Sequence, residues 1–137
     1  MLFLLNGAVI WGSDDVYLAL ARTAYTPDID AHDFWNDVNA ADEITGTNWP
    51  AGGVQADGET LSLVTANNDV EFDITDESVA TVTLSDAKHL IVYTRTPGTD
   101  ATRELIGYAT FDVALAPAGG TLLLDFATTG LWLIDYT

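Results

Sequence analysis

The sequence contains no cysteine and very few basic residues. Among its 137 residues, one lysine and three arginines stand against 21 acidic residues, which gives a formal net charge of −17. The lack of cysteine excludes disulfides, thiolate nucleophiles and most structural zinc sites. The acidic composition repels phosphate backbones and anionic membranes, so we expect neither nucleic acid nor membrane as a partner.

The shortage of basic residues also bears on the environment of the protein. The acidic residues are scattered along the chain, and 48% of all residues are hydrophobic, which is enough for a packed core. At low ionic strength such a charge destabilises a small domain by self-repulsion, whereas in molar salt the screening length falls to about 3 Å. We therefore expect adaptation to high salt. The alternative is an acidic surface that meets a basic partner.

Short runs of alternating apolar and polar residues, separated by turn residues, recur through the chain. In one of them Val70, Phe72 and Ile74 alternate with acidic residues, which is the period of a strand with one buried face. Such strands at intervals of about ten residues predict an antiparallel β-sandwich or barrel-like fold in a single domain, 1–137. The predicted strands are 16–21, 60–65, 70–74, 80–84, 90–94, 105–113, 121–126 and 131–136.

The first twelve residues fit this strand pattern, whereas one later segment breaks it. The first twelve residues are apolar, but they lack a basic leader and a small-residue cleavage pattern and are too few to span a bilayer, so we expect a buried first strand. The segment 28–44 is irregular. Within it, Asp30 is expected to cap a short helical turn near residues 31–37.

The uncharged stretch TGTNWPAGG, residues 45–53, follows this turn. Gly46, Gly52 and Gly53 permit backbone angles that other residues avoid, and Pro50 cannot donate to a strand ladder. The stretch is therefore predicted to be a long surface loop in which the glycines are structural. It is not a phosphate-binding loop, because no lysine follows the glycines.

The four tryptophans fall into two groups. Trp11 and Trp132 lie in strand-like apolar runs and are expected in the core. Trp35 and Trp49 lie in the irregular region, where an aromatic ring either packs a loop down or anchors a partner. Together with the neighbouring Pro50, they are the candidate partner-contact residues.

No organised catalytic site is predicted. The two histidines, His32 and His89, accompany no GxSxG motif or other organised nucleophile, so we expect no enzymatic activity. The sequence from residue 28 begins like a calcium loop, but its sixth and twelfth positions hold aspartate and asparagine where an EF-hand has glycine and glutamate. A looser site for a cation such as calcium, at Asp28 and Asp30 or at 73–77, stays open. No other cofactor is expected.

Several motifs, taken together, resemble a known family. In order and spacing they resemble a widespread family of small structural proteins encoded by tailed viruses, over nearly the whole chain. Members of this family commonly have tyrosine where this chain has Trp49. The motifs are VYLAL at 16–20, YTPD at 25–28, HDFW at 32–35, TGTNW and GG within 45–53, LIVY at 90–93, LIGY at 105–108 and GLWL at 130–133.

This resemblance implies a virion component, most specifically a capsid decoration or cement protein on the surface of the head. A tail or baseplate component is the alternative within the same class. The implied partners are the major capsid protein or other virion proteins and further copies of the chain, in a homo-oligomer such as a trimer or in a lattice. The acidity is what a virus of a halophilic archaeon would show, and the family supplies no catalytic residues.

A different class of function also fits the predicted fold. Sandwiches with aromatic loops also serve as carbohydrate-binding modules or small hydrolases. A pair of acidic residues could serve a glycosidase, but among 21 acidic residues some pair meets by chance. A carbohydrate-binding module or small hydrolase is the third hypothesis, because its support is the predicted fold and aromatic loops alone.

The charge predicts a strong dependence of stability on salt. Two like unit charges ~10 Å apart at a dielectric constant near 80 repel by about 0.4 kcal/mol, and many such pairs rival a net stability of ~5–15 kcal/mol. We expect the melting temperature, measured by calorimetry, to be markedly higher in about 2 M potassium chloride than in about 50 mM. A non-ionic osmolyte is the control, because salts also strengthen apolar burial. A melting temperature that stays flat across this range would contradict adaptation to salt.

Overall fold

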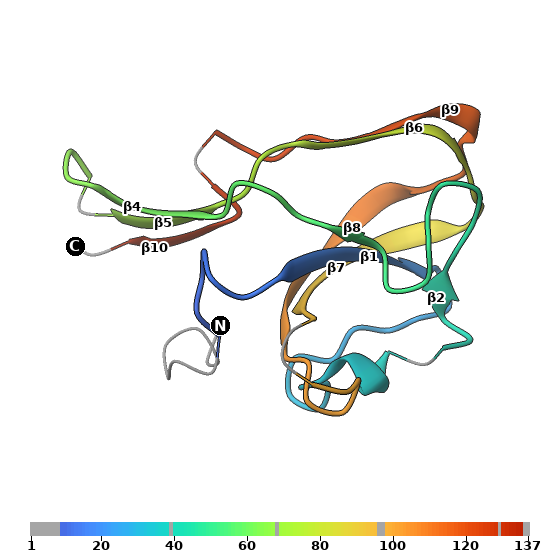
Figure 1. The fold of residues 1–137 in the computed structure, drawn as a ribbon, viewed down its shortest axis with the longest axis horizontal. Helices are drawn as coiled ribbons and strands as arrows, with labels where there is room; N and C mark the ends of the chain where they lie inside the picture. Colours follow the sequence, from blue (N-terminus) through green and yellow to red (C-terminus); the bar gives the residue numbers. More distant parts are fainter. Residues whose placement is uncertain (1–8, 39, 68, 96–97, 129, 136–137) are drawn as a thin grey trace.

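The computed structural model describes residues 9–38, 40–67, 69–95, 98–128 and 130–135. It consists mostly of antiparallel strands with one short 3-10 turn, so the predicted all-β, sandwich-like fold is confirmed (Figure 1). Within the described part of the chain, no helix has the length and hydrophobicity of a membrane span. The elements are β1 Val16–Arg22, η1 Trp35–Asp37, β2 Glu43–Ile44, β3 Val54–Gln55, β4 Thr60–Val64, β5 Asp69–Asp73, β6 Glu77–Thr83, β7 Ala87–Thr94, β8 Leu105–Leu115, β9 Ala118–Leu124 and β10 Trp132–Asp135.

Strand β1 is the centre of the largest sheet. One of its edges pairs with β7, which places Leu18 opposite Val92, and the other edge pairs with the short strands β2 and β3. Strand β8 extends the sheet beyond β7. Both faces of β1 are buried, because Leu18 and Leu20 belong to the main core whereas Ala19 and Ala21 belong to a second cluster. This double burial explains why the segment is apolar almost throughout.

Two smaller sheets complete the fold. One has the strand order β10-β5-β4, and the other is the pair β6 and β9. Figure 1 shows β4, β5 and β10 projecting away from the five-stranded sheet, while β6 and β9 run along one side of the molecule. The main core joins the central sheet to the β6–β9 pair, since Val82, Leu122 and Leu124 cluster with Leu18 and Val92.

The eight predicted strands from 16–21 onward are confirmed, with differences of a few residues at their ends. Most of the predicted first strand, residues 1–8, lies outside the described residues; after it, the N–H of Ser13 donates to the carbonyl of Ile10 at 3.0 Å in a turn. The sequence pattern does not predict β2 and β3, because two-residue strands carry no periodicity.

The helical turn lies where the sequence predicts it, but Asp30 does not cap it. The turn spans Trp35–Asp37 and follows Phe34, whose backbone is extended. The carboxylate of Asp37 accepts hydrogen bonds from the backbone N–H groups of Asp33 and Phe34, both at 2.9 Å. An acidic side chain inside the turn thus supplies the acceptor at its start, and the capping role predicted for Asp30 is wrong.

Candidate functional site

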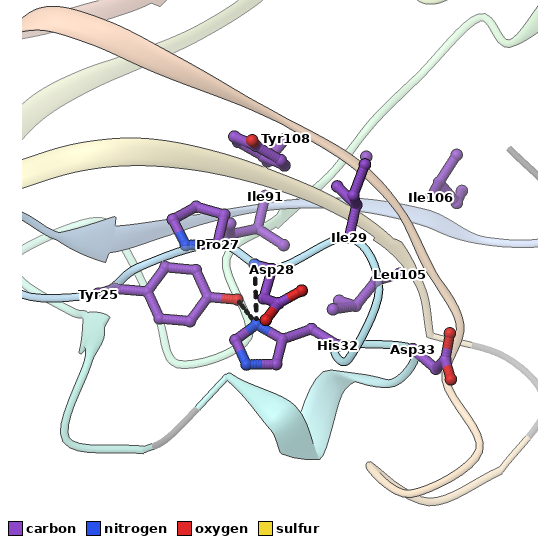
Figure 2. A pocket seen from close by; sticks show the side chains of 11 residues that line it. Tyr25, Pro27, Asp28, Ile29, His32, Asp33, Ile91, Leu105, Ile106 and Tyr108 are labelled. Carbon is purple, nitrogen blue, oxygen red and sulfur yellow. Dashed lines mark hydrogen bonds between the residues drawn. The ribbon is translucent and has the colours of Figure 1, made fainter.

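A cavity of about 210 Å³ lies between the segment 25–33 and strands β7 and β8 (Figure 2). Its polar groups come from Tyr25, Asp28, His32 and Asp33, and Tyr108 adds an aromatic ring. The cavity therefore combines apolar walls with two carboxylates. The other lining residues are Pro27, Ile29, Ile91, Leu105, Ile106 and Gly107.

Both histidines of the chain contact Tyr25. The Tyr25 hydroxyl lies 2.9 Å from His32 Nδ1 and the two rings stack, while the ring of His89 meets that of Tyr25 edge-on with centroids 5.9 Å apart. His89 Nδ1 lies 2.9 Å from the hydroxyl of Thr110. Burial raises the pKa of Tyr25 to about 12 and lowers the pKa of His89 below its ordinary value. Tyr25 and His89 are therefore neutral near pH 7 and act as packing residues that also form hydrogen bonds.

The lining of the cavity offers a small ligand both hydrogen-bonding groups and apolar contacts. None of its described lining residues is serine, threonine, cysteine or lysine, so His32 has no such nucleophile to activate within it. A small group could instead rest on Tyr108 and Ile29 and form hydrogen bonds with the carboxylates. Sequence reasoning misses this cavity, because the segment 25–33 and strands β7 and β8 are far apart in the sequence and are brought together only by the fold.

The candidate cation site at Asp28 and Asp30 does not gain a third ligand. One carboxylate oxygen of Asp28 accepts hydrogen bonds from the backbone N–H groups of Asp30 at 3.0 Å and Ala31 at 3.2 Å, which closes a local turn. Among the described residues, including the acidic run 73–77, no group of three or more histidine, cysteine or acidic side chains is placed to hold a metal ion. The structure therefore does not support the predicted calcium site.

The loop 45–53 is shaped by close backbone contacts. The backbone groups of Gly46 and Trp49 exchange two hydrogen bonds, at 2.9 and 3.1 Å. A Cβ atom added to Gly46 would overlap the carbonyl of Thr83, and one added to Gly53 would overlap the carbonyl of Leu18. Only glycine fits at these two positions, in agreement with the structural role predicted for them.

Trp49 is part of the core. Its ring is fully buried and belongs to the main cluster with Leu18, Val82 and Leu84. Its Nε1–H has no hydrogen-bond partner among the described residues, so packing alone holds the ring. The predicted role of Trp49 as a partner anchor is therefore wrong, and the alternative, that it packs the loop down, is correct. The adjacent Pro50 is exposed, and its contact role stays a prediction.

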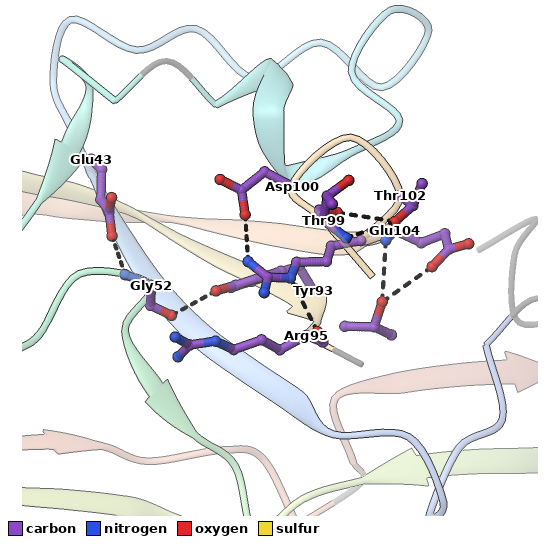
Figure 3. Close-up of polar contacts among 10 residues, drawn as sticks. Glu43, Gly52, Tyr93, Arg95, Thr99, Asp100, Thr102 and Glu104 are labelled. Carbon is purple, nitrogen blue, oxygen red and sulfur yellow. Dashed lines mark hydrogen bonds and ion pairs between the residues drawn. The ribbon is translucent and has the colours of Figure 1, made fainter. Parts of the chain in front are cut away.

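Trp35 is buried in the second cluster. Its ring stacks on Tyr93 with centroids 4.2 Å and planes 11° apart. Figure 3 shows how hydrogen bonds connect Tyr93 of β7 to the loop 45–53. The Tyr93 hydroxyl donates to the carbonyl of Gly52 at 2.8 Å, and the N–H of Gly52 donates to the carboxylate of Glu43. Burial raises the pKa of Tyr93 to about 12, so the hydroxyl remains a donor. Trp35 therefore ties the helical turn to β7 and the loop, and its predicted anchor role is wrong for the same reason.

Two of the four basic residues lie beside this second cluster. The guanidinium of Arg95 lies 4.7 Å from the centre of the Tyr17 ring. Arg103 forms an ion pair with Asp100 and donates through Nε to the carbonyl of Arg95 at 3.0 Å (Figure 3). These scarce cations thus serve local structure and do not offset the acidic surface at a distance.

Apolar side chains on exposed strands are the surface feature that sequence reasoning misses. Leu61 and Leu63 of β4 are 58% and 66% exposed, Leu123 of β9 is 58% exposed and Val113 of β8 is 76% exposed. Leu61 and Leu63 are two residues apart on one strand and therefore share one face. Their alternation with polar residues predicts a strand but does not reveal that both leucines stay more than half exposed.

A scan against protein-family models, a search of curated proteins and a search of solved structures found no match to the chain. The resemblance of its motifs to tailed-virus structural proteins therefore remains a hypothesis. The charge, the cavity and the exposed strands are the features of the chain that bear on its function.

The close approach of the loop to β1 predicts a selective effect of substitution. Gly53→Ala should lower the free energy of unfolding by roughly 3 kcal/mol, because φ is +74° and the added Cβ meets the Leu18 carbonyl. Gly119→Ala is the control: φ is +79°, but the Cβ has open space, so we expect a loss of about 1 kcal/mol. Urea denaturation in high salt measures both, and equal losses would contradict the role of the close contact.

Proposed function

We propose that this chain is a virion structural protein, most specifically a capsid decoration protein that binds the assembled head. The observation that carries the proposal is the pair of exposed leucines on β4, Leu61 and Leu63, on a sheet that projects from the body of the domain (Figure 1). Adjacent exposed apolar side chains of this kind mark surfaces that contact other proteins. The order of the sequence motifs supports the same class of function.

The physical properties of the domain suit this role. A decoration protein stabilises a capsid by binding only the assembled form, so it needs a rigid fold with contact surfaces and no reactive site. Here Trp35 and Trp49 belong to the two buried hydrophobic clusters and hold the loops in place. The proposed partners are the major capsid protein or other virion proteins, and the proposed location is the capsid surface in high salt.

One observation favours a second candidate function, a carbohydrate-binding module. The cavity of Figure 2 is lined by the ring of Tyr108, which is 45% exposed, and by the carboxylates of Asp28 and Asp33. Aromatic faces with nearby hydrogen-bonding groups suit sugar rings. A titration with a panel of oligosaccharides, followed by tryptophan and tyrosine fluorescence, separates this function from the first, with Tyr108→Ala as the control.

The number of copies per particle tests the proposed function. Quantitative mass spectrometry of purified virions, with the major capsid protein as internal standard, should find a number of copies comparable to that of the capsid protein. A few copies per virion would instead indicate a tail or baseplate component. Absence of the chain from the virion would contradict the proposal.

A further inference from the structure

Among the described strands, β4 is an open edge of the projecting sheet. It lies at the end of the strand order β10-β5-β4, and its residues Thr60–Val64 carry no charge and are mostly exposed. Its five pairs with β5 follow one register without interruption, from Thr60 opposite Asp73 to Val64 opposite Asp69. Such a regularly paired, uncharged edge is a template for pairing with another strand.

The other strand edges are protected by features that β4 lacks. The pairing of β8 with β7 shifts register twice, and β8 carries Asp112. The pairing of β6 with β9 also shifts twice, beside Thr81 with its positive φ. β10 carries Asp135, and β2 and β3 have two residues each. Bulges, charges and short length are the usual protection of a strand edge, so β4 is the edge left available among the strands that the structure describes.

One end of the β4 face is already covered. The ring of Trp11 meets that of Phe72 edge-on at 5.8 Å, and its Nε1 donates to the carbonyl of Thr60 at 2.8 Å. Phe72 lies opposite Leu61, and Val70 lies opposite Leu63. The domain thus packs the Phe72 end of this face against itself and leaves the Leu63 end open.

We infer that β4 pairs in antiparallel fashion with β4 of a second copy of the chain, so that the three-stranded sheet becomes a six-stranded sheet across a two-fold axis. The pairing centres on Ser62, which faces Ser62 of the other copy, and it places Leu61 opposite Leu63 and Thr60 opposite Val64. Every pair within the strand is then uncharged, and leucine meets leucine on one face. This inference deepens the proposed function by naming one contact of the virion lattice, and it rests on that function.

Charge favours this register and makes it depend on salt. Glu59, just outside the strand, faces Thr65 of the other copy and not an acid. The acid closest to the axis within the sheet is Glu71, which accepts a hydrogen bond from the Ser62 hydroxyl at 3.3 Å. The two Glu71 backbones lie about 14 Å apart across three strand spacings, beyond the screening length of about 8 Å at physiological salt. Low salt therefore weakens the pairing of two copies of net charge −17.

The expected contact is small. Two five-residue strands bury far less than the roughly 1,200–2,000 Å² of a stable complex, so the isolated chain should associate weakly and only at high concentration. A capsid lattice raises the effective concentration of neighbouring copies and converts a weak contact into a useful one.

Cysteine cross-linking tests the register without background, because the chain has no cysteine of its own. In the 137-residue chain at high salt, the Ser62→Cys thiols of the two copies lie directly opposite each other. The two Cα atoms are then within the separation of about 4.4–6.8 Å that a disulfide requires. Thr60→Cys is the matched control at another exposed position of β4: the two copies of residue 60 would be about 13 Å apart. Under mild oxidation, S62C should form disulfide dimers at least about tenfold faster than T60C. Equal rates, or a faster T60C, would overturn the inference.

A second pair of variants tests the same contact without oxidation. Leu63→Glu adds a charge to the proposed contact, whereas Val113→Glu adds one to a similarly exposed position on β8. Sedimentation at high salt should show that L63E abolishes concentration-dependent association while V113E leaves it unchanged. Association that survives L63E would overturn the inference. Both tests use the purified chain, so a negative result in them does not change the number of copies found in virions. Likewise, absence of the chain from virions does not change the association measured for the purified chain.

Discussion

Pairing along both edges of β1 is the constraint on which the rest of the fold depends. Strand β7 covers one edge, while β2 and β3 cover two parts of the other, so the chain between β2 and β3 must leave the sheet and return to it. The loop 45–53 makes this excursion, and Gly53 brings its backbone against Leu18 on the return. Trp49 within the loop is thereby buried in the core. The return of the loop 45–53 to β1 therefore determines both the order of the strands around β1 and the burial of Trp49.

The net charge decides which surfaces can serve as contacts. Two copies with a net charge of −17 repel each other unless salt or a basic surface offsets the charge. Strand β4 offers an uncharged backbone edge, whereas β8, β10 and the β6–β9 pair carry acids or irregular pairing. The same composition that disfavours nucleic acids and anionic membranes thus restricts self-association to a small part of the molecule.

Much of the fold could be predicted from sequence, because alternation and turn residues mark strands that have one wet face, such as 70–74. Two-residue strands carry no such signal, so the sequence pattern does not predict β2 and β3. For Trp35 and Trp49 the sequence left two alternatives, since a ring in an irregular segment either packs or protrudes. Only tertiary contacts, with Tyr93 and with the core around Leu18, decide between them. The Tyr25 cavity and the open β4 edge likewise depend on which strands become neighbours.

The central claim is that the domain buries Trp35 and Trp49 inside and leaves the β4 edge open for another copy. Hydrogen exchange of the full chain in high salt, followed by mass spectrometry at low and high protein concentration, tests both parts together. Amides of β1 and β7 should exchange slowly at every concentration, whereas the amides of β4 that point away from β5 should become slow only at high concentration. Exchange in β4 that does not change with concentration, or rapid exchange in β1, would contradict the account.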